Sequence, residues 1–447
     1  MKKNCTAILV FTLISANLPV LAGNDKTAPT GDRNDPVAVP IDKEITKSGL
    51  NVGLLPALFY NNDLGFSVGA LAQVFDYGDG SVYPNYRHKF MANINLYSRG
   101  AKQITMSYDS KYLVPDKRVT ATISYMDNPL CGFYGFNGAV SPYYADLDLR
   151  KSVDNSEGIA FYATHQQLFS ASVDLQGRLT DGLTWIGGAY YAWQHYADVD
   201  FRVYDGTESL FHQYVENNLI PEADIHGHRV ELKGGLVYDT RDFETNPERG
   251  LYATVTTTSG ASFSGGAKPS LALTADLRQY VPIWPGRITL AWQLAYKGLL
   301  AGALPFYALP SFAMRGSFGS RIAGNGVAWA STDLRLRIAS FQAMQQNFEL
   351  GLVGFADAGA VVQPYKYAEQ TSLGACKVEK TLDGETTGPY ASVYDPQIAT
   401  RERLHTSVGG GFWFAMNRNF LTTFEFGRPL NPQDGSFGMY VNMGFSF

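Results

Sequence analysis

Beyond its first residues, the sequence lacks any apolar run approaching the roughly 18 residues that a membrane-spanning helix requires. Charged residues are scarce, at 17% of the 447-residue chain, and the net charge of −5 gives no sign of a nucleic-acid partner. Cysteine is scarce as well, with three residues in the whole chain. Cys131 and Cys376, which lie outside the amino-terminal run, could pair in an oxidising compartment or could be two unpaired loop cysteines.

Aromatic residues and glycine are abundant, with 27 Tyr, 27 Phe and 45 Gly. A membrane β-barrel has this composition, because its lipid face is spread over alternate residues of many strands and needs no continuous hydrophobic block. The composition therefore favours a barrel over a helical membrane protein, and it is unusual for a soluble protein of this length.

The amino terminus has the features of a secretory signal peptide. Lys2 and Lys3 precede an apolar run over 7–21, and the small-residue motif at 20–22 is a suitable cleavage site. We therefore predict a signal peptide at 1–22, since the run is too short for a spanning helix. Its removal takes away two lysines and changes the net charge from −5 to −7.

The last eleven residues alternate as a β-strand does when its two faces meet different environments. The large apolar positions are Phe437, Met439, Val441, Met443, Phe445 and Phe447. A strand with lipid on one face and water on the other, closing a barrel, explains this alternation. The ending also resembles the terminal-phenylalanine assembly signal of bacterial outer-membrane barrels, which implies that role for Phe445 and Phe447.

Residues 23–49 are polar and show no periodicity, which predicts a short periplasmic leader without room for a folded domain. Residues 50–447 consist of alternating segments separated by turn residues. We predict an all-β fold there, a 16-stranded antiparallel transmembrane β-barrel with both termini on the periplasmic side. The predicted strands are 51–60, 63–77, 86–98, 101–112, 117–127, 158–179, 183–199, 225–240, 249–260, 269–282, 285–299, 327–339, 346–358, 404–415, 419–427 and 436–447.

Charged residues fall on one face of the predicted strands, as Asp276 and Arg278 do opposite Leu273 and Leu277. A Lys or Arg at mid-bilayer costs roughly 2–4 kcal/mol, so the charged face should line the lumen. The four long connections are 128–157, 200–224, 300–326 and 359–403. All four follow odd-numbered strands and should lie on one side, as the long outer loops of bacterial barrels do.

Three groups of residues in the second half of the chain form an ordered set of motifs. They are Val237-Tyr238-Asp239-Thr240-Arg241-Asp242 with Asn246-Pro247 and Arg249-Gly250, then Pro305-Phe306-Tyr307 with Met314-Arg315-Gly316-Ser317 and Gly324-Asn325, then Gly354-Phe355-Ala356-Asp357-Ala358-Gly359. In this order, ahead of a terminal Phe, they resemble the barrel of the BamA/TamA outer-membrane assembly-factor superfamily, the bacterial surface-antigen barrel. The first group is similar to the family's periplasmic turn between strands eight and nine, the second to its sixth outer loop, and the third to the strand facing that loop.

The resemblance implies that the long sixth loop folds inward, with Arg315 and Gly316 at its tip. It further implies that Arg315 pairs with Asp357 and with Asp333 inside the lumen. The faces of the residues agree, since Asp357 has the same strand parity as Glu349 and should point inward. Charge-assisted hydrogen bonds would then form in a partly dehydrated lumen. The alternative is that Arg315 is a solvated loop residue.

The chain departs from the family pattern in two respects. Met314 and Ser317 stand where the family usually has Val and an aromatic residue, and Asp333 stands where Glu is commoner. BamA and TamA also carry periplasmic POTRA domains that receive client proteins, and the leader 23–49 has no room for one. This second departure puts client delivery by this chain alone in doubt.

The resemblance implies a place in the bacterial outer membrane, in contact with its lipid, and a role in inserting or exporting polypeptides. The path would be a weak seam between strands 51–60 and 436–447. Pro56 removes a backbone donor there and would loosen the seam, unless it is a tolerated proline near the start of the strand. Expected partners are client polypeptides and a separate periplasmic subunit. The alternative function is a passive outer-membrane pore or a surface-antigen scaffold.

We expect no enzyme activity, no cofactor and no metal site. Residues 65–69 match the GxSxG hydrolase pattern around Ser67, but that pattern works on a strand-to-helix turn and here lies inside an alternating strand. A barrel-embedded lipid hydrolase that uses Ser67 is a third hypothesis. His226 and His228 share a strand face, yet without a third ligand they are more simply a rim or pore-lining pair.

Overall fold

The structure is a computed structural model. It describes residues 46–61, 64–83, 85–143, 148, 161–201, 204–205, 209–344, 346–372, 377–382, 385–392, 402–417 and 420–447. The predicted signal peptide 1–22, most of the leader 23–49, and Cys376 with its predicted pairing lie outside the described residues.

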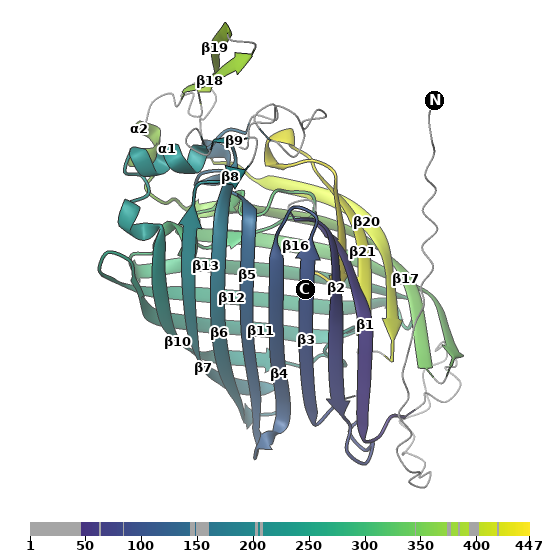
Figure 1. Ribbon diagram of the computed structural model, residues 1–447. Coiled ribbons are helices and arrows are strands. Elements are labelled where there is room, and N and C mark those ends of the chain that lie inside the picture. Colours follow the sequence, from purple (N-terminus) through teal and green to yellow (C-terminus); the bar gives the residue numbers. More distant parts are fainter. Residues whose placement is uncertain are drawn as a thin grey trace, which may run out of the picture.

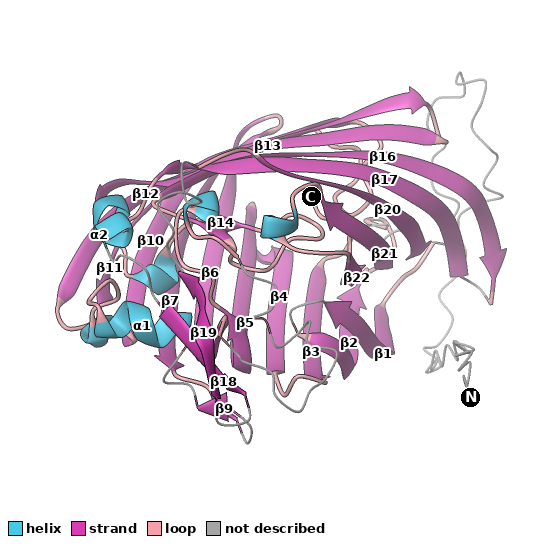
Figure 2. Ribbon diagram, turned by 90° about the horizontal axis from the view of Figure 1, so that it is seen from above, coloured by secondary structure: helices cyan, strands magenta, loops and turns pink. Residues whose placement is uncertain are grey.

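Sixteen strands form one antiparallel sheet that curves around a lumen (Figures 1 and 2). They are β1 Leu50–Asn61, β2 Gly65–Asp76, β3 His88–Tyr97, β4 Lys102–Val114, β5 Lys117–Gly132, β6 Ala163–Thr180, β7 Leu183–Ala197, β10 His226–Asp239, β11 Gly250–Phe263, β12 Ala267–Trp284, β13 Ile288–Gly302, β16 Gly326–Ala343, β17 Gln346–Gln363, β20 His405–Met416, β21 Phe420–Pro429 and β22 Gly438–Met443. Each strand pairs with the next along the chain, so the predicted transmembrane β-barrel of sixteen strands is confirmed.

The remaining elements lie in the connections. The short strands are β8 Asp200–Phe201, β9 Tyr204–Asp205, β14 Ser311–Phe312, β15 Ile322–Ala323, β18 Lys377–Leu382 and β19 Glu385–Ser392. The helices are α1 Leu210–Glu216, α2 Tyr367–Ser372 and the 3-10 turns η1 Gly138–Val140, η4 Glu222–Asp224, η5 Phe306–Ala308 and η6 Pro432–Asp434. Among the described residues no helix is long and apolar enough to cross a membrane.

The two faces of the wall differ in polarity as the alternation predicts. In β10, Val230, Leu232 and Leu236 point outward and are 47–66% exposed, as lipid-facing side chains are in the isolated chain. Arg229 and Glu231, on the opposite face of the same strand, form an ion pair at 3.4 Å. The charged face therefore lines the lumen, because a cation costs least where water or an opposite charge can reach it.

Two predicted strands, 117–127 and 346–358, end well short of the observed ones at the outer end. The observed β5 runs to Gly132 and β17 runs to Gln363. The ladder between β5 and β6 continues to the pair Gly132 and Ala163. Backbone pairing persists here beyond the hydrocarbon layer, where apolar alternation no longer marks it. The long connections rise on one side of the barrel, where Figure 1 shows α1, α2 and β18 to β19.

A seam separates the first strand of the sheet from the last. β1 and β22 lie side by side, but within the described parts of the chain no backbone ladder joins them, whereas fifteen ladders join the other neighbours. β22 has only six residues, half the length of the 12-residue β1. Pro56 lies within β1, where its backbone stands opposite Ala70 of β2. Within the described parts of the chain, β1 and β22 are therefore the two edges of the sheet.

We predict faster amide exchange at the seam than in the rest of the wall. No described ladder joins β1 to β22, and strands at the edge of a sheet open more readily than strands that are paired on both sides. Hydrogen exchange measured by mass spectrometry on the barrel in lipid nanodiscs should show lower protection in 50–60 and 438–443 than in β16 and β17. Equal protection across these strands would contradict a weak seam.

Candidate functional site

The connection 303–325 between β13 and β16, the sixth outer loop, runs back into the lumen. Its tip residue Arg315 is 7% exposed, and the carboxylate of Asp333, which it contacts, is fully buried. A buried arginine needs opposite charge and filled hydrogen bonds to offset its desolvation. The groups around the Arg315 side chain therefore determine whether the sixth loop is stable inside the lumen.

Arg315 is held by three carboxylates from three strands of the wall. Its Nε and Nη2 donate to the two oxygens of Asp357 at 2.9 and 2.7 Å, and its Nη1 donates to Asp333 at 2.9 Å and to Glu425 at 3.1 Å. Its guanidinium also lies over the ring of Phe355, 3.6 Å from the ring centroid. The bidentate pair with Asp357 is of the geometry that makes arginine–carboxylate bonds strong and directional.

The strand facing the loop explains why its motif alternates an aromatic residue, an acid and a glycine. Phe355 supplies the face under the guanidinium, and Asp357, two residues later on the same side, supplies the paired oxygens. Gly359 comes next on that side, and a Cβ there would lie 2.2 Å from the ring of Phe312 in the sixth loop. The motif therefore provides the sixth loop with an aromatic ring under Arg315, a carboxylate that pairs with it, and room for the Phe312 ring beside Gly359.

Close backbone packing fixes the tip of the loop against the last two strands. Gly316 has a φ of +98°, and a Cβ on it would come within 2.8 Å of the β21 backbone at Gly427. The Gly316 N–H donates to the Tyr440 hydroxyl of β22 at 2.9 Å. Ser317, which stands where the family usually has an aromatic residue, closes the turn by accepting the Met314 N–H at 3.0 Å.

A second buried arginine shares a carboxylate with the first. Arg335 of β16 donates to Asp333 at 3.0 Å, so Asp333 lies between the two guanidinium groups. The Arg335 guanidinium lies 3.7 Å from the centroid of the Phe445 ring, and its Nη2 donates to the backbone oxygen of Phe447 at 3.1 Å. Arg335 thereby links the sixth-loop site to the residues after β22.

The chain after Met443 differs from the predicted strand 436–447, which was expected to run to Phe447 along the lipid face. Gly444 has a φ of +94°, and from there the chain turns into the lumen, where Figure 2 places its end. Phe447 is 8% exposed and packs against Tyr280 of β12. The buried guanidinium of Arg335 lies over the rings of Phe445 and Phe447, and this cation–π attraction favours the inward position over the lipid face. The assembly-signal role of Phe445 and Phe447 stays a prediction.

The outer loops share a packed aromatic cluster with the sixth loop. The cluster consists of Phe133, Tyr134, Phe136, Tyr143, Phe161, Tyr162, Tyr196, Leu210, Phe211, Tyr214, Leu219, Ile220, Leu304, Phe306, Ala308, Leu309, Phe318 and Tyr365. Tyr134 stacks on Phe318 of the sixth loop, with ring centroids 5.1 Å apart. Arg321 of the same loop is 1% exposed and donates to the backbone of Gly138 at 2.8 Å. The outer loops and the sixth loop therefore form one buried unit.

Other candidates from the sequence occupy ordinary positions in the wall. Ser67 lies near the start of β2, where its backbone pairs with Tyr97 of β3, and its Oγ donates to the side-chain oxygen of Asn95 at 3.4 Å. His228 bonds the Tyr191 hydroxyl at 2.8 Å, and His226 and His228 are both exposed at the outer end of β10. Among the described residues no group of three or more ligand-type side chains could hold a metal. The Cys131 Sγ lies 3.5 Å from Gln166.

The structure thus brings together Arg315, Asp333 and Asp357, the three charged residues named from the sequence. The sequence did not identify Glu425 as a partner of Arg315. It also missed the contact of Tyr440 with the loop tip. Parity along β21 and β22 could have shown that both side chains point inward, but only the fold shows that they lie at the same height as the tip.

Residues 88–447 match the model of the Omp85 superfamily domain, and no curated protein matches the chain. The fold is similar to BamA from Haemophilus ducreyi lacking POTRA domains 1-3, with 15% identity and a TM-score of 0.52 over 89% of this chain and 71% of that chain. It is also similar to CdiB from Escherichia coli, with 10% identity and a TM-score of 0.50 over 89% of this chain and 63% of that chain. The chain therefore spans less than two thirds of the CdiB chain.

We predict that Arg315→Ala destabilises the barrel. It removes the cation shared by three buried carboxylates, and loss of one partner of a buried pair costs about 3–5 kcal/mol. The temperature at which the folded form disappears in a heat-modifiable gel shift should fall. Arg178→Ala is the matched control, because Arg178 lies near the end of β6 with 71% of its side chain exposed, and its loss should cost under about 1 kcal/mol. Equal transition temperatures for the two variants would contradict a structural role for the Arg315 site.

Proposed function

The chain belongs to the Omp85 superfamily of outer-membrane proteins, and on this premise we propose that it helps client polypeptides to insert into, or cross, the outer membrane through the seam between β1 and β22. The observation that carries the proposal is the missing ladder between these strands in the described parts of the chain. An edge strand in lipid is costly, so a polypeptide that forms a ladder with β1 or β22 would gain free energy there.

The inward turn of the chain after Gly444 supports the same proposal. If residues 444–447 continued as a strand, they would extend the pairing with β21 and cover more of the β1 edge. The contacts of Arg335 with Phe445 and Phe447 favour the inward position instead. β22, the shorter edge of the seam, therefore ends where the contacts of Arg335 hold the following residues inside the lumen.

The packing at the outer end argues against a wide passive channel as the main function. The sixth loop occupies the lumen at Arg315, and Phe318 of this loop stacks within the outer aromatic cluster. A channel for solutes would instead need a continuous water-filled path through these buried side chains. A surface role for the outer loops is compatible with this packing and is the second candidate.

We propose further that the chain performs no chemistry and that client folding drives the process. Ser67, the one residue in a hydrolase-like pattern, lies in a strand and contacts Asn95 rather than a histidine. Client polypeptides and outer-membrane lipid are the proposed partners. A separate periplasmic subunit that delivers clients is part of the proposal, and pull-down of the tagged barrel from native membranes would identify it.

The proposal predicts that the purified barrel accelerates insertion of an unfolded client. The probe is a small outer-membrane barrel polypeptide unfolded in urea, added to lipid vesicles that contain the protein. Its heat-resistant, protease-protected fraction should appear faster than with empty vesicles. Cysteine pairs placed between 50–54 and 438–443, on a background with Cys131→Ser and Cys376→Ser, should abolish the acceleration when oxidised and restore it when reduced.

The controls are the corresponding single cysteine variants, which cannot close the seam. Conductance across a planar bilayer separates the two candidate functions. Small, flickering currents together with client insertion favour the assembly role. Large, steady currents that are unchanged by the oxidised cysteine pairs, without acceleration of the client, would overturn the proposal and favour a passive pore.

A further inference from the structure

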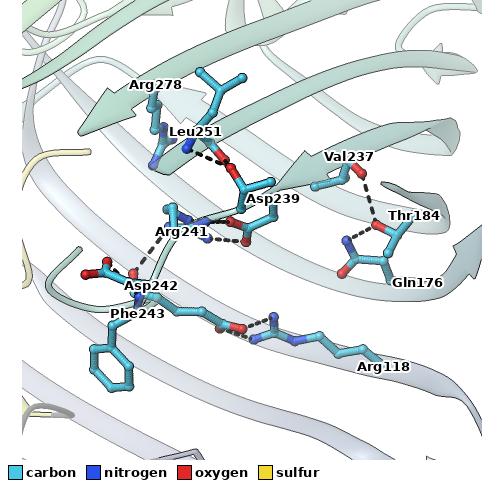
Figure 3. Close-up of polar contacts among 12 residues, drawn as sticks. Arg118, Gln176, Thr184, Val237, Asp239, Arg241, Asp242, Phe243, Leu251 and Arg278 are labelled. Carbon is cyan, nitrogen blue, oxygen red and sulfur yellow. Dashed lines mark hydrogen bonds and ion pairs between the residues drawn. The ribbon is translucent and has the colours of Figure 1, made fainter. Parts of the chain in front are cut away.

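The connection between β10 and β11, residues 240–249, is more than a hairpin turn. Figure 3 shows its residues Arg241, Asp242 and Phe243, with the Arg118 side chain of β5 extending toward this segment. A turn that only joined two paired strands would bond to its own hairpin. This segment also bonds to strands on both sides of the seam, so we name residues 240–249 the cross-lumen brace.

Contacts within its own hairpin hold the brace in one conformation. The Asp242 carboxylate accepts the backbone N–H groups of Phe243 at 2.9 Å and Glu248 at 3.0 Å, which ties the two ends of the segment together. Arg241 forms a bidentate pair with Asp239 at 2.9 and 2.8 Å and lies 4.5 Å from the ring centroid of Tyr252. The brace is thus a rigid base from which its other side chains project.

One end of the brace is anchored to β4 and β5. The Glu244 carboxylate accepts from Lys111 at 2.8 Å and from Arg118 at 3.0 and 3.2 Å. Arg118 is also held by Asp109 at 2.7 and 2.9 Å, so this anchor is fixed to the wall. Burial alone would raise the pKa of Glu244, but Arg118 and Lys111 outweigh it and hold the pKa at about 2. The carboxylate is therefore charged at neutral pH.

The other end is anchored to β16 and β17. Glu248 forms an ion pair with Arg337 of β16, and the Asn246 amide donates to Glu349 of β17 at 3.4 Å. Arg337 and Glu349 in turn lie 3.7 Å apart, which joins the two contacts into one group. These partners are far from β4 and β5 in the strand order, and the seam lies between the two anchors.

We propose that the cross-lumen brace sets the distance between the two halves of the wall that flank the seam, and so limits how far the seam opens. The strands β17, β20, β21 and β22 lie on one side of the seam, and β1 to β5 lie on the other. Separation of the seam edges spreads these two groups of strands. The ion pairs at Glu244 and Glu248 oppose this movement, because each would lose a charged partner as the wall spreads.

The inference rests on the proposed function in one respect, since the seam matters only if it opens. Its test needs no client and can therefore fail or succeed independently of that function. Spin labels are placed at Pro115→Cys in the β4–β5 turn and at Met344→Cys in the β16–β17 turn, both exposed, with Cys131→Ser and Cys376→Ser in the background. Pulsed electron paramagnetic resonance then measures the distance across the periplasmic end in nanodiscs.

Glu244→Gln with Glu248→Gln should broaden the distance distribution and shift it to longer distances. Asp181→Asn is the matched control, because Asp181 is acidic and lies in a periplasmic turn, but it pairs only with Arg178 of its own hairpin in the described contacts. The control should give the distribution of the parent barrel. If the double variant does not assemble, Glu248→Gln alone is measured, since Arg337 then keeps Glu349.

An unchanged distance distribution in a folded Glu248→Gln or double variant would overturn the brace. Such a result would leave client insertion to be judged by its own assay. Conversely, a broader distribution in a barrel that fails to accelerate client insertion would support the brace and count against the proposed function. The two conclusions are therefore distinguishable.

Discussion

Backbone pairing in hydrocarbon is the constraint on which this structure depends. An amide or carbonyl that faces lipid without a hydrogen-bond partner is unfavourable, and the apolar side chains of the lipid face offer it no partner. The sixteen strands therefore curve until the edges of the sheet meet. This requirement is met by ladders between fifteen neighbouring pairs and is least well met between β1 and β22. The seam is consequently the part of the wall where another polypeptide could gain most by pairing.

Charge pairing organises the inside of the barrel in the same way that backbone pairing organises the wall. Asp333 lies between Arg315 of the sixth loop and Arg335, whose guanidinium contacts Phe445 beyond the last strand. The loop tip also touches β22 through Tyr440. A change in the position of the sixth loop would therefore alter its contacts with β22 directly. The cross-lumen brace applies the same physics at the periplasmic end, where Glu244 and other side chains tie opposite walls together.

Much of the wall could be predicted from the sequence, because a strand in a barrel repeats one local rule. The alternation of Val230, Leu232 and Leu236 with charged residues gives the strand, its two faces and its place in the count. Arg315 with Asp357 was reached through motif resemblance and not through periodicity. The inward turn at Gly444 was missed, because Phe445 and Phe447 continue the same alternation whether they face lipid or a buried guanidinium.

The sequence by itself determined the number of wall strands, the side that faces the lumen and the side that carries the long loops, because each depends on neighbours along the chain. Tertiary structure decided which distant groups meet. Glu425 joins Arg315 across 110 positions, and Glu244 joins Arg118 across 126. Such contacts depend on strand stagger and on the curvature of the whole sheet, and no local pattern encodes these two quantities.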